Sequence, residues 1–205
     1  MLKSLLDAVM ARRARRLMEQ VGEWLPSEGP VLDLGSGTGH LSERAERELG
    51  LEVVTADVSD IHVVGRAPVL IDDGALPFDD SAFSAALLCF VLAYPQNPAA
   101  VLAEAARVTR GPVILVQTLY SGRLGYAWHR GREFLWTVVA FYISTLVGYL
   151  PPSALFSMNT RRFYTPESLS RDVSAAGLRI CAREERPVLP NRSLTVAAWV
   201  LERHG

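Results

Sequence analysis

One glycine-rich stretch, VLDLGSGTGH (31–40), constrains the fold more than any other part of the chain. A short apolar strand pattern leads into three alternate glycines, Gly35, Gly37 and Gly39, and a helical pattern follows and ends at Gly50. Glycine tolerates the positive φ of a tight turn and lets the backbone approach a ligand closely. A strand that turns into a helix in this way is typical of α/β folds, which bind ligands at the carboxyl ends of their strands.

The rest of the chain alternates strand patterns with helix patterns. Apolar runs bounded by turn residues predict strands within 51–60, 67–73, 81–92, 111–118 and 194–202. Helices are predicted over 95–110 and 165–177, where Asn97 and Thr165 stand as N-caps, each directly before a proline. Because each strand reads as a near-continuous apolar run, the pattern indicates an α/β fold with a mainly parallel sheet.

The glycine turn disfavours two common ligand classes. A P-loop would require Gly-Lys-Ser/Thr after four intervening residues, and the chain has no such sequence. A dinucleotide fingerprint would place glycine or alanine where His40 stands. His40 and the acid Asp33 ahead of the turn therefore disfavour a dinucleotide as the ligand, but an NAD-type oxidoreductase stays open as an alternative.

Acidic and glycine positions occur here in the order found in one enzyme family. Asp33 and the three glycines match an acid followed by Gly-x-Gly-x-Gly, and Asp57 closes the second predicted strand. DDGALPFDDSAF (72–83) and VLAEAARVTRGPVILV (101–116) continue the match. The chain therefore resembles the class I S-adenosylmethionine-dependent methyltransferases, in particular the methyltransferase type 11-like group. The resemblance is specific over 30–118, looser over 160–202 and absent over 119–159.

The resemblance implies both a fold and a cofactor. The fold would be a Rossmann-like, seven-stranded, mostly parallel sheet flanked by helices, and the cofactor S-adenosyl-L-methionine. Asp33 would counter the cationic end of the cofactor, turn N–H groups would receive its carboxylate, and Asp57 would accept from its ribose hydroxyls. The expected cofactor-binding residues are Asp33, Gly35, Ser36, Gly37, Gly39, Asp57, Val58, Asp72, Asp73 and Cys89.

The sequence departs from the family pattern at three places. The segment between Asp57 and Asp72 is short, so we expect the helix usual there to be missing or reduced. Ser84 stands where an aspartate is common, and TRGPV (109–113) lacks the usual Pro-Gly-Gly. A methyltransferase-like binding protein without catalytic activity therefore stays open beside the enzyme.

An apolar segment follows the fifth predicted strand. Residues 134–150 are all uncharged, and we expect an apolar helical cap insert over 119–160. A membrane span is disfavoured because it would separate residues 160–202 from the strands they should join. A buried core helix stays open, but an apolar wall beside the acceptor favours methylation of a small, hydrophobic molecule. His129 and Tyr120 are weak candidates for a catalytic base.

Charge and composition limit the partners. The formal net charge is −1, so no basic field points to nucleic acid. Residues 1–25 predict an amphipathic helix whose leucines and basic residues fit a peripheral membrane contact or, equally, a helix that covers the sheet. Cys89 and Cys181 lie far apart in the sequence, which predicts a cytoplasmic protein without disulfides or a metal site. We expect a single methyltransferase domain over 1–205.

Overall fold

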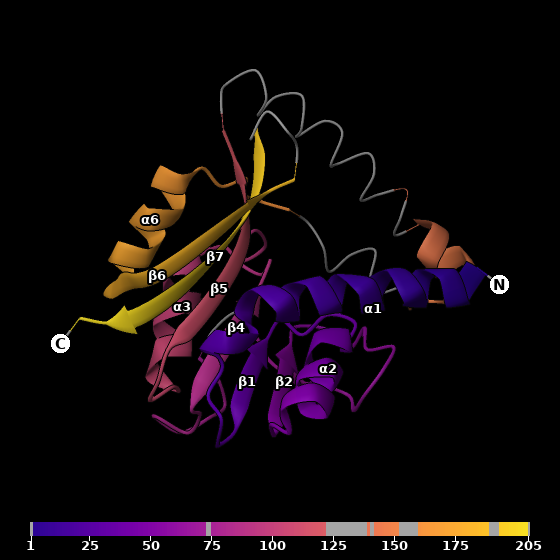
Figure 1. The fold of residues 1–205 in the computed structure, drawn as a ribbon, viewed down its shortest axis with the longest axis horizontal. Helices are drawn as coiled ribbons and strands as arrows, with labels where there is room; N and C mark the ends of the chain where they lie inside the picture. The colour runs from indigo at the N-terminus through magenta and orange to yellow at the C-terminus, as the bar shows by residue number, and fades with distance from the viewer. Residues whose placement is uncertain are drawn as a thin grey trace.

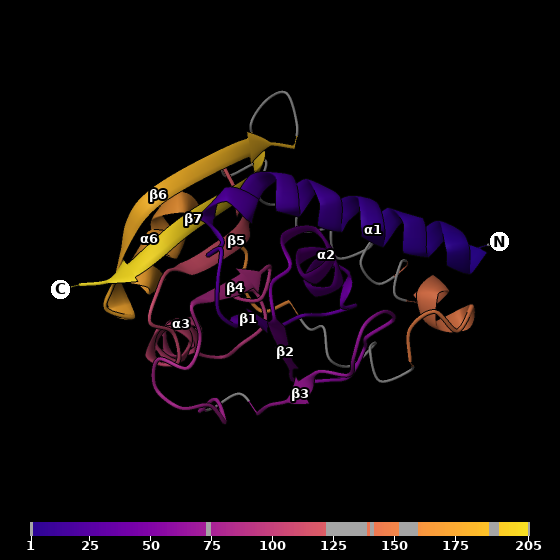
Figure 2. The same ribbon diagram turned by 60° about the horizontal axis from the view of Figure 1, so that its bottom comes forward.

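A seven-stranded sheet forms the centre of the molecule (Figures 1 and 2). The structure, a computed structural model, describes residues 2–72, 75–121, 139, 142–151, 160–188 and 193–204. The strand order is β3-β2-β1-β4-β5-β7-β6, in which β1 to β5 pair in parallel and β7 runs antiparallel to both of its neighbours. The prediction of a seven-stranded, mostly parallel sheet is confirmed.

Six of the strands coincide with apolar runs in the sequence, whereas β6 is rich in charged residues. Its ten residues form a strand because they pair with β7 along nearly their whole length. No apolar run marks its bounds, since most of its side chains are exposed at the sheet edge. The strands are β1 (Val31–Leu34), β2 (Val53–Asp57), β3 (Val69–Leu70), β4 (Ala85–Cys89), β5 (Val113–Tyr120), β6 (Leu178–Pro187) and β7 (Leu194–Arg203).

Helices cover both faces of the sheet. One face packs against α1 (Leu2–Val21) and α2 (His40–Leu49), and the other against α3 (Pro98–Arg107) and α6 (Pro166–Ala175). A short 3-10 helix, η1 (Gly22–Trp24), follows α1. Both predicted N-caps are confirmed: the Asn97 side chain accepts from the N–H of Ala100 at 3.2 Å, and Thr165 forms a capping box with Ser168.

Helix α1 extends beyond the sheet in its N-terminal part (Figure 1). Its second half packs on the sheet through Ala14, Leu17, Met18 and Val21, while its first half continues past α2 (Figure 1). Three apolar residues of the first half, Leu2, Leu5 and Val9, are exposed to solvent, whereas Leu6 and Met10 pack in a cluster with Tyr149 and Leu150. The sequence periodicity predicted the helix, but not that its apolar positions divide between core and solvent.

Two connections bear on the site. Residues 58–68 contain no helix or strand, so the prediction that the usual helix is missing there is confirmed. Of the expected 119–160 insert, the structure describes a helix at 142–146 that ends before Gly148, whose φ is +65°. Residues 122–138, 140–141 and 152–159 of the insert lie outside the described residues. Among the described residues, no helix has the length and apolarity needed to cross a membrane.

Candidate functional site

The three glycines of the turn between β1 and α2 share a backbone conformation but differ in what surrounds them. All three have a positive φ, at +76° for Gly35, +57° for Gly37 and +81° for Gly39. A Cβ on Gly35 would lie 2.3 Å from a methyl of Val91, and one on Gly39 would lie 2.4 Å from the carbonyl oxygen of Val64. A Cβ on Gly37 would meet no protein atom within 4 Å. The protein therefore packs tightly around two glycines and leaves open space over Gly37.

Asp57, the last residue of β2, lies against this turn. One carboxylate oxygen accepts a hydrogen bond from the N–H of Gly37 at 2.8 Å, and the other accepts from the N–H of Ser59 at 3.3 Å. The residue is 8% exposed. Because an ionised carboxylate can accept about four hydrogen bonds, Asp57 keeps the capacity to accept from a ligand's hydroxyl groups.

Asp33 lies beneath the turn rather than on its surface. It is buried, and its carboxylate accepts a hydrogen bond from the hydroxyl of Ser42 in α2. Burial raises the pKa of Asp33 to about 6, the Ser42 hydrogen bond opposes this rise, and the nearby Asp57 adds to it. A cationic group close to this carboxyl would offset the cost of its buried charge.

The segment 58–68 holds the outer side of the turn. The N–H groups of Val63 and Val64 donate to the carbonyl of Thr38 at 3.1 and 3.4 Å. The ring of His62 hydrogen-bonds to the hydroxyl of Ser36 through Nε2 at 2.8 Å. No sequence pattern marked His62, because its partner lies 26 residues away and the contact depends on how this loop folds over the turn.

Helix α1 is attached to the same turn through His40. The Nδ1 atom of His40 lies 3.0 Å from the hydroxyl of Thr38, and its Nε2 atom lies 3.0 Å from the carboxylate of Asp7 in α1. An Nε2–H tautomer satisfies both contacts, donating to Asp7 and accepting from Thr38. His40 therefore connects α1 to the glycine turn, a role that nothing in its sequence position indicated.

A third element reaches the site at the carboxyl end of β4. Phe90 directly follows β4 and has a φ of +63°, a strained conformation for a residue with a Cβ. The guanidinium carbon of Arg13 lies 4.5 Å from the centre of the Phe90 ring. Burial raises the pKa of the neighbouring Cys89 thiol well above its usual value, so this cysteine is a neutral thiol. Strain and a cation at one strand end mark Arg13 and Phe90 as site candidates that the sequence pattern missed.

The other predicted site residues are placed as follows. Val58 and Asp72 are exposed after β2 and β3, on the same carboxyl edge of the sheet as Asp57. Tyr120 is buried at the end of β5, where its ring packs edge-on against Phe163 with centroids 5.4 Å apart. Asp73 and His129 lie outside the described residues.

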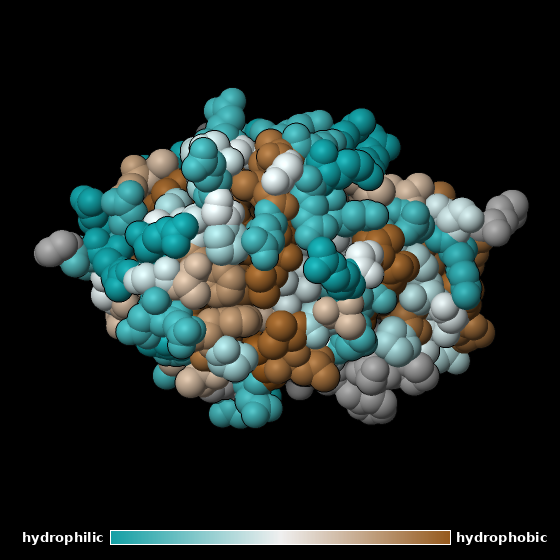
Figure 3. All heavy atoms as spheres, turned by 90° about the horizontal axis from the view of Figure 1, so that it is seen from below, coloured by the Kyte–Doolittle hydropathy of each residue, from teal (hydrophilic) through white to brown (hydrophobic). Residues whose placement is uncertain are grey.

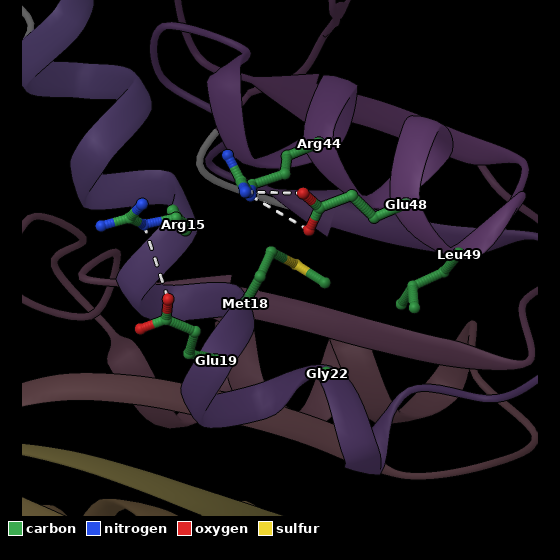
Figure 4. A pocket seen from close by; sticks show the side chains of 7 residues that line it. All are labelled: Arg15, Met18, Glu19, Gly22, Arg44, Glu48 and Leu49. Atoms are coloured by element: carbon green, nitrogen blue, oxygen red, sulfur yellow. Dashed lines mark hydrogen bonds and ion pairs between the residues drawn. The ribbon is translucent and has the colours of Figure 1, made fainter.

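Two hollows occur elsewhere on the described surface. One of about 250 Å³ lies between the second half of α1 and the end of α2, where the ion pairs Arg15–Glu19 and Arg44–Glu48 flank Met18 (Figure 4). It adjoins the C-terminal end of α2, opposite the glycine turn, and is a groove between two packed helices. The other, of about 370 Å³, lies between the start of α1 and residues 148–149.

A family model described as a methyltransferase domain matches residues 6–182. The match includes α1, the glycine turn, Asp57 and the β4 end. The chain belongs to this methyltransferase family. It is an S-adenosylmethionine-dependent methyltransferase, and an NAD-type oxidoreductase is no longer a candidate. A comparison with curated proteins finds no match.

Solved structures of other proteins share the fold of this methyltransferase. A protein of Bacillus halodurans C-125 assigned as a methyltransferase has a TM-score of 0.61 at 15% identity and covers 93% of this chain and 99% of its own. Geranyl diphosphate C-methyltransferase from Streptomyces coelicolor A3(2) has a TM-score of 0.62 at 12% identity, covering 97% and 82%. The [4+2]-cyclase SpnF has a TM-score of 0.64 at 16% identity, covering 93% and 81%. These likenesses show the fold and leave the acceptor open.

The residues at the carboxyl edge fit S-adenosylmethionine. The open space over Gly37 admits a ligand against the backbone, and Asp57 beside it has acceptor capacity for two ribose hydroxyls. When ionised, the buried Asp33 would offset the positive charge of a cofactor that carries a sulfonium and an ammonium. When bound, the cofactor supplies a methyl group that is already activated. The chain's residues then have to hold it, align the acceptor and exclude water.

Proposed function

We propose that this methyltransferase methylates a small, hydrophobic acceptor, such as a lipid, an isoprenoid, a quinone precursor or a polyketide-like metabolite. The supporting observation is that the described ends of the 119–160 insert lie at the carboxyl edge of the sheet. This edge also carries the glycine turn and Asp57, so whatever lines it faces the transferred methyl group.

The described ends of the insert reach three loops of that edge. The insert begins at Tyr120, where β5 ends. Tyr149 and Leu150 pack with Ile61, in the segment that holds the glycine turn. The N–H groups of Arg161 and Arg162 then donate to the carbonyl of Ala93, after β4, at 2.8 and 3.1 Å. The insert and the two arginines directly after it therefore contact the edge on both sides of β1, whose end leads into the glycine turn.

The polarity of this insert favours an apolar acceptor. Its 134–150 stretch is uncharged, and the described residues Tyr149 and Leu150 form an apolar cluster with Ile61 at this edge. Apolar side chains of this kind stabilise a bound acceptor through the apolar area that it buries. They offer a charged acceptor no hydrogen-bond or ion-pair partner. One solved structure of the same fold holds geranyl diphosphate, a molecule with an isoprenoid chain, together with Mg²⁺ and S-adenosyl-L-homocysteine.

The proposal also covers where the protein acts, which acceptors are disfavoured and which residues are candidate bases. We place the protein in the cytoplasm, in keeping with two free cysteines, and consider nucleic acid disfavoured as an acceptor by a formal net charge of −1. Tyr120 and His129 stay candidate bases, needed where the acceptor is a hydroxyl or an acidic carbon. Replacement of Tyr120 by Phe keeps the ring that packs on Phe163 and removes only the hydroxyl.

The experiment measures methyl transfer from tritiated S-adenosylmethionine to a homologous series of acceptors. All members share one reacting group and differ only in alkyl chain length. If an apolar wall binds the chain, kcat/KM rises roughly fourfold per methylene, the value of about 0.8 kcal/mol per buried CH₂. A kcat/KM that does not change with chain length contradicts the proposal.

The departures at Ser84 and 109–113 led us to expect a binding protein without turnover as an alternative, and the same assay tests that expectation. Calorimetry combined with the tritium assay separates a binding protein from an enzyme. Binding of S-adenosylhomocysteine together with no tritiated product from any acceptor in a panel of phenols, carboxylic acids and isoprenoid alcohols assigns the binding role. Product from one hydrophobic acceptor excludes it.

A further inference from the structure

The outer face of α1 combines exposed apolar and basic residues. At about 100° per residue, five positions fall within an arc of about 80°. They are Leu2, Leu5, Val9, Arg12 and Arg16, and all are exposed. Leu5 and Val9 expose 60% and 51% of their surface, although the neighbouring Leu6 and Met10 pack in a cluster with Tyr149 and Leu150. We call this set the α1 stripe.

A second exposed apolar set lies next to the stripe. The helix at 142–146 exposes Tyr142, Ile143 and Leu146, the last by 68%. The two sets are joined below the surface, because Leu6 and Met10 of α1 pack with Val147, Tyr149 and Leu150. Figures 1 and 2 both place this short helix beside the N-terminal end of α1, and Figure 3 shows hydrophobic atoms on the surface at that end.

The basic charges of the stripe are uncompensated within the part of the chain that the structure describes. Arg15 pairs with Glu19, and Asp7, the other acid of α1, is bound to His40. No described acid pairs with Lys3, Arg12 or Arg16. A helix face that carries leucines and unpaired cations matches an interface with an apolar interior and an anionic surface.

We propose that the α1 stripe and the helix at 142–146 dock on a lipid bilayer that contains anionic lipids. A second copy of the chain fits less well, because a symmetric contact would bury four arginines in one interface, and the stripe has no acid to pair with them. A bilayer takes up the leucines and neutralises the arginines together. The proposal rests on the proposed function in one respect: a hydrophobic acceptor would dissolve in the bilayer and reach the site from there.

The surface is attached directly to the cofactor edge. Two α1 residues outside the stripe contact the site: Asp7, on the opposite face, bonds to His40 at the glycine turn, and Arg13, beside the stripe, lies over Phe90 at the end of β4. Docking through the outer face of α1 therefore places the inner face, and the edge it contacts, next to the bilayer. An acceptor dissolved in the membrane then has only the thickness of this helix layer to cross.

Cosedimentation of the full chain with vesicles tests the proposal. We expect binding to phosphatidylcholine vesicles that contain about 30 mol% phosphatidylglycerol and little binding to pure phosphatidylcholine. The double variant Arg12→Gln/Arg16→Gln is expected to bind about 25-fold more weakly, at roughly fivefold per basic residue. Leu5→Ser/Val9→Ser is expected to lose at least about tenfold, since its side chains no longer enter the apolar layer.

The control removes two exposed arginines elsewhere. Arg171→Gln/Arg183→Gln, on α6 and β6, changes the net charge by the same amount, and its vesicle binding should stay within about twofold of the wild type. All the changed side chains are exposed, so unchanged S-adenosylhomocysteine binding confirms that each variant is folded. Equal weakening by both arginine pairs would show that net charge alone acts, and it would overturn the proposal.

Two further outcomes also overturn it. One is a failure of the wild type to bind phosphatidylglycerol vesicles. The other is a concentration-dependent dimer that Leu5→Ser/Val9→Ser dissociates, which would assign the surface to a second copy of the chain. The vesicle assay contains no acceptor, so its failure leaves the chain-length series untouched, and failure of that series leaves the docking surface standing.

Discussion

Replacement of Gly37 by Ala tests whether the glycine turn approaches the cofactor. The substitution keeps the N–H that donates to Asp57 and adds one methyl group. This methyl would meet no protein atom within 4 Å, so within the protein it costs only backbone strain. Gly50 provides a matched control, because it also has a positive φ, at +67°, and equally open surroundings at the far end of α2.

The magnitudes follow from this geometry. Alanine in the left-handed region costs about 1–2 kcal/mol, partly offset by a less flexible unfolded chain, so each variant should lose about 1 kcal/mol of stability. In a chain of this size that lowers Tm by roughly 2–4 °C. If a bound ligand occupies the space over Gly37, the added methyl overpacks it by about 1–3 kcal/mol. The affinity then falls roughly 5- to 150-fold in Gly37→Ala alone.

Titration calorimetry with S-adenosylhomocysteine measures the affinity, and a thermal melt of each apoprotein measures stability. The expected result is a similar Tm for the two variants and a loss of affinity confined to Gly37→Ala. Wild-type affinity in Gly37→Ala would refute the argument that the space over this glycine belongs to the cofactor.

Three further predictions concern the acids around the turn. The pKa of Asp33 is raised by burial to about 6, so its contribution to stability is present below about pH 4 and lost as pH rises through 6. Asp33→Asn should therefore leave the melting temperature unchanged near pH 4, stabilise the apoprotein by up to about 3 kcal/mol at pH 8, and weaken S-adenosylhomocysteine binding. An equal gain in stability at both pH values would contradict burial as the cause. Asp57→Ala should lower the calorimetric affinity for S-adenosylhomocysteine at least about tenfold. Asp57→Asn should fall between it and the wild type because the amide oxygen can still accept from Gly37, while Asp79→Ala, exposed ahead of β4, should stay at wild type. Asp7→Ala should lower stability in urea by about 1 kcal/mol and weaken the same ligand, because His40 loses the bond that ties α1 to the turn; a loss of stability at unchanged affinity would mean that α1 does not position the turn.

The sequence determined the local parts of this protein. The turn at 35–39, the helix that begins at His40 and ends before Gly50, and the caps at Asn97 and Thr165 follow from residues within a few positions of each other. Glycine conformations, capping bonds and apolar runs act over such short ranges, so the alternation of elements and the α/β class could be predicted. The absence of a helix in 58–68 followed from the length of that segment alone.

Only the tertiary structure decided how distant residues meet. Ser36 and His62 are 26 residues apart and Asp7 and His40 are 33 apart, and each pair depends on a loop or helix crossing the glycine turn. The sequence also left open which apolar residues of α1 face the core, because a helical repeat fixes their spacing but not the direction in which the helix packs. That direction is set by the sheet surface of β4, β5 and β7, which takes Ala14 and Leu17 and leaves Leu5 and Val9 in solvent.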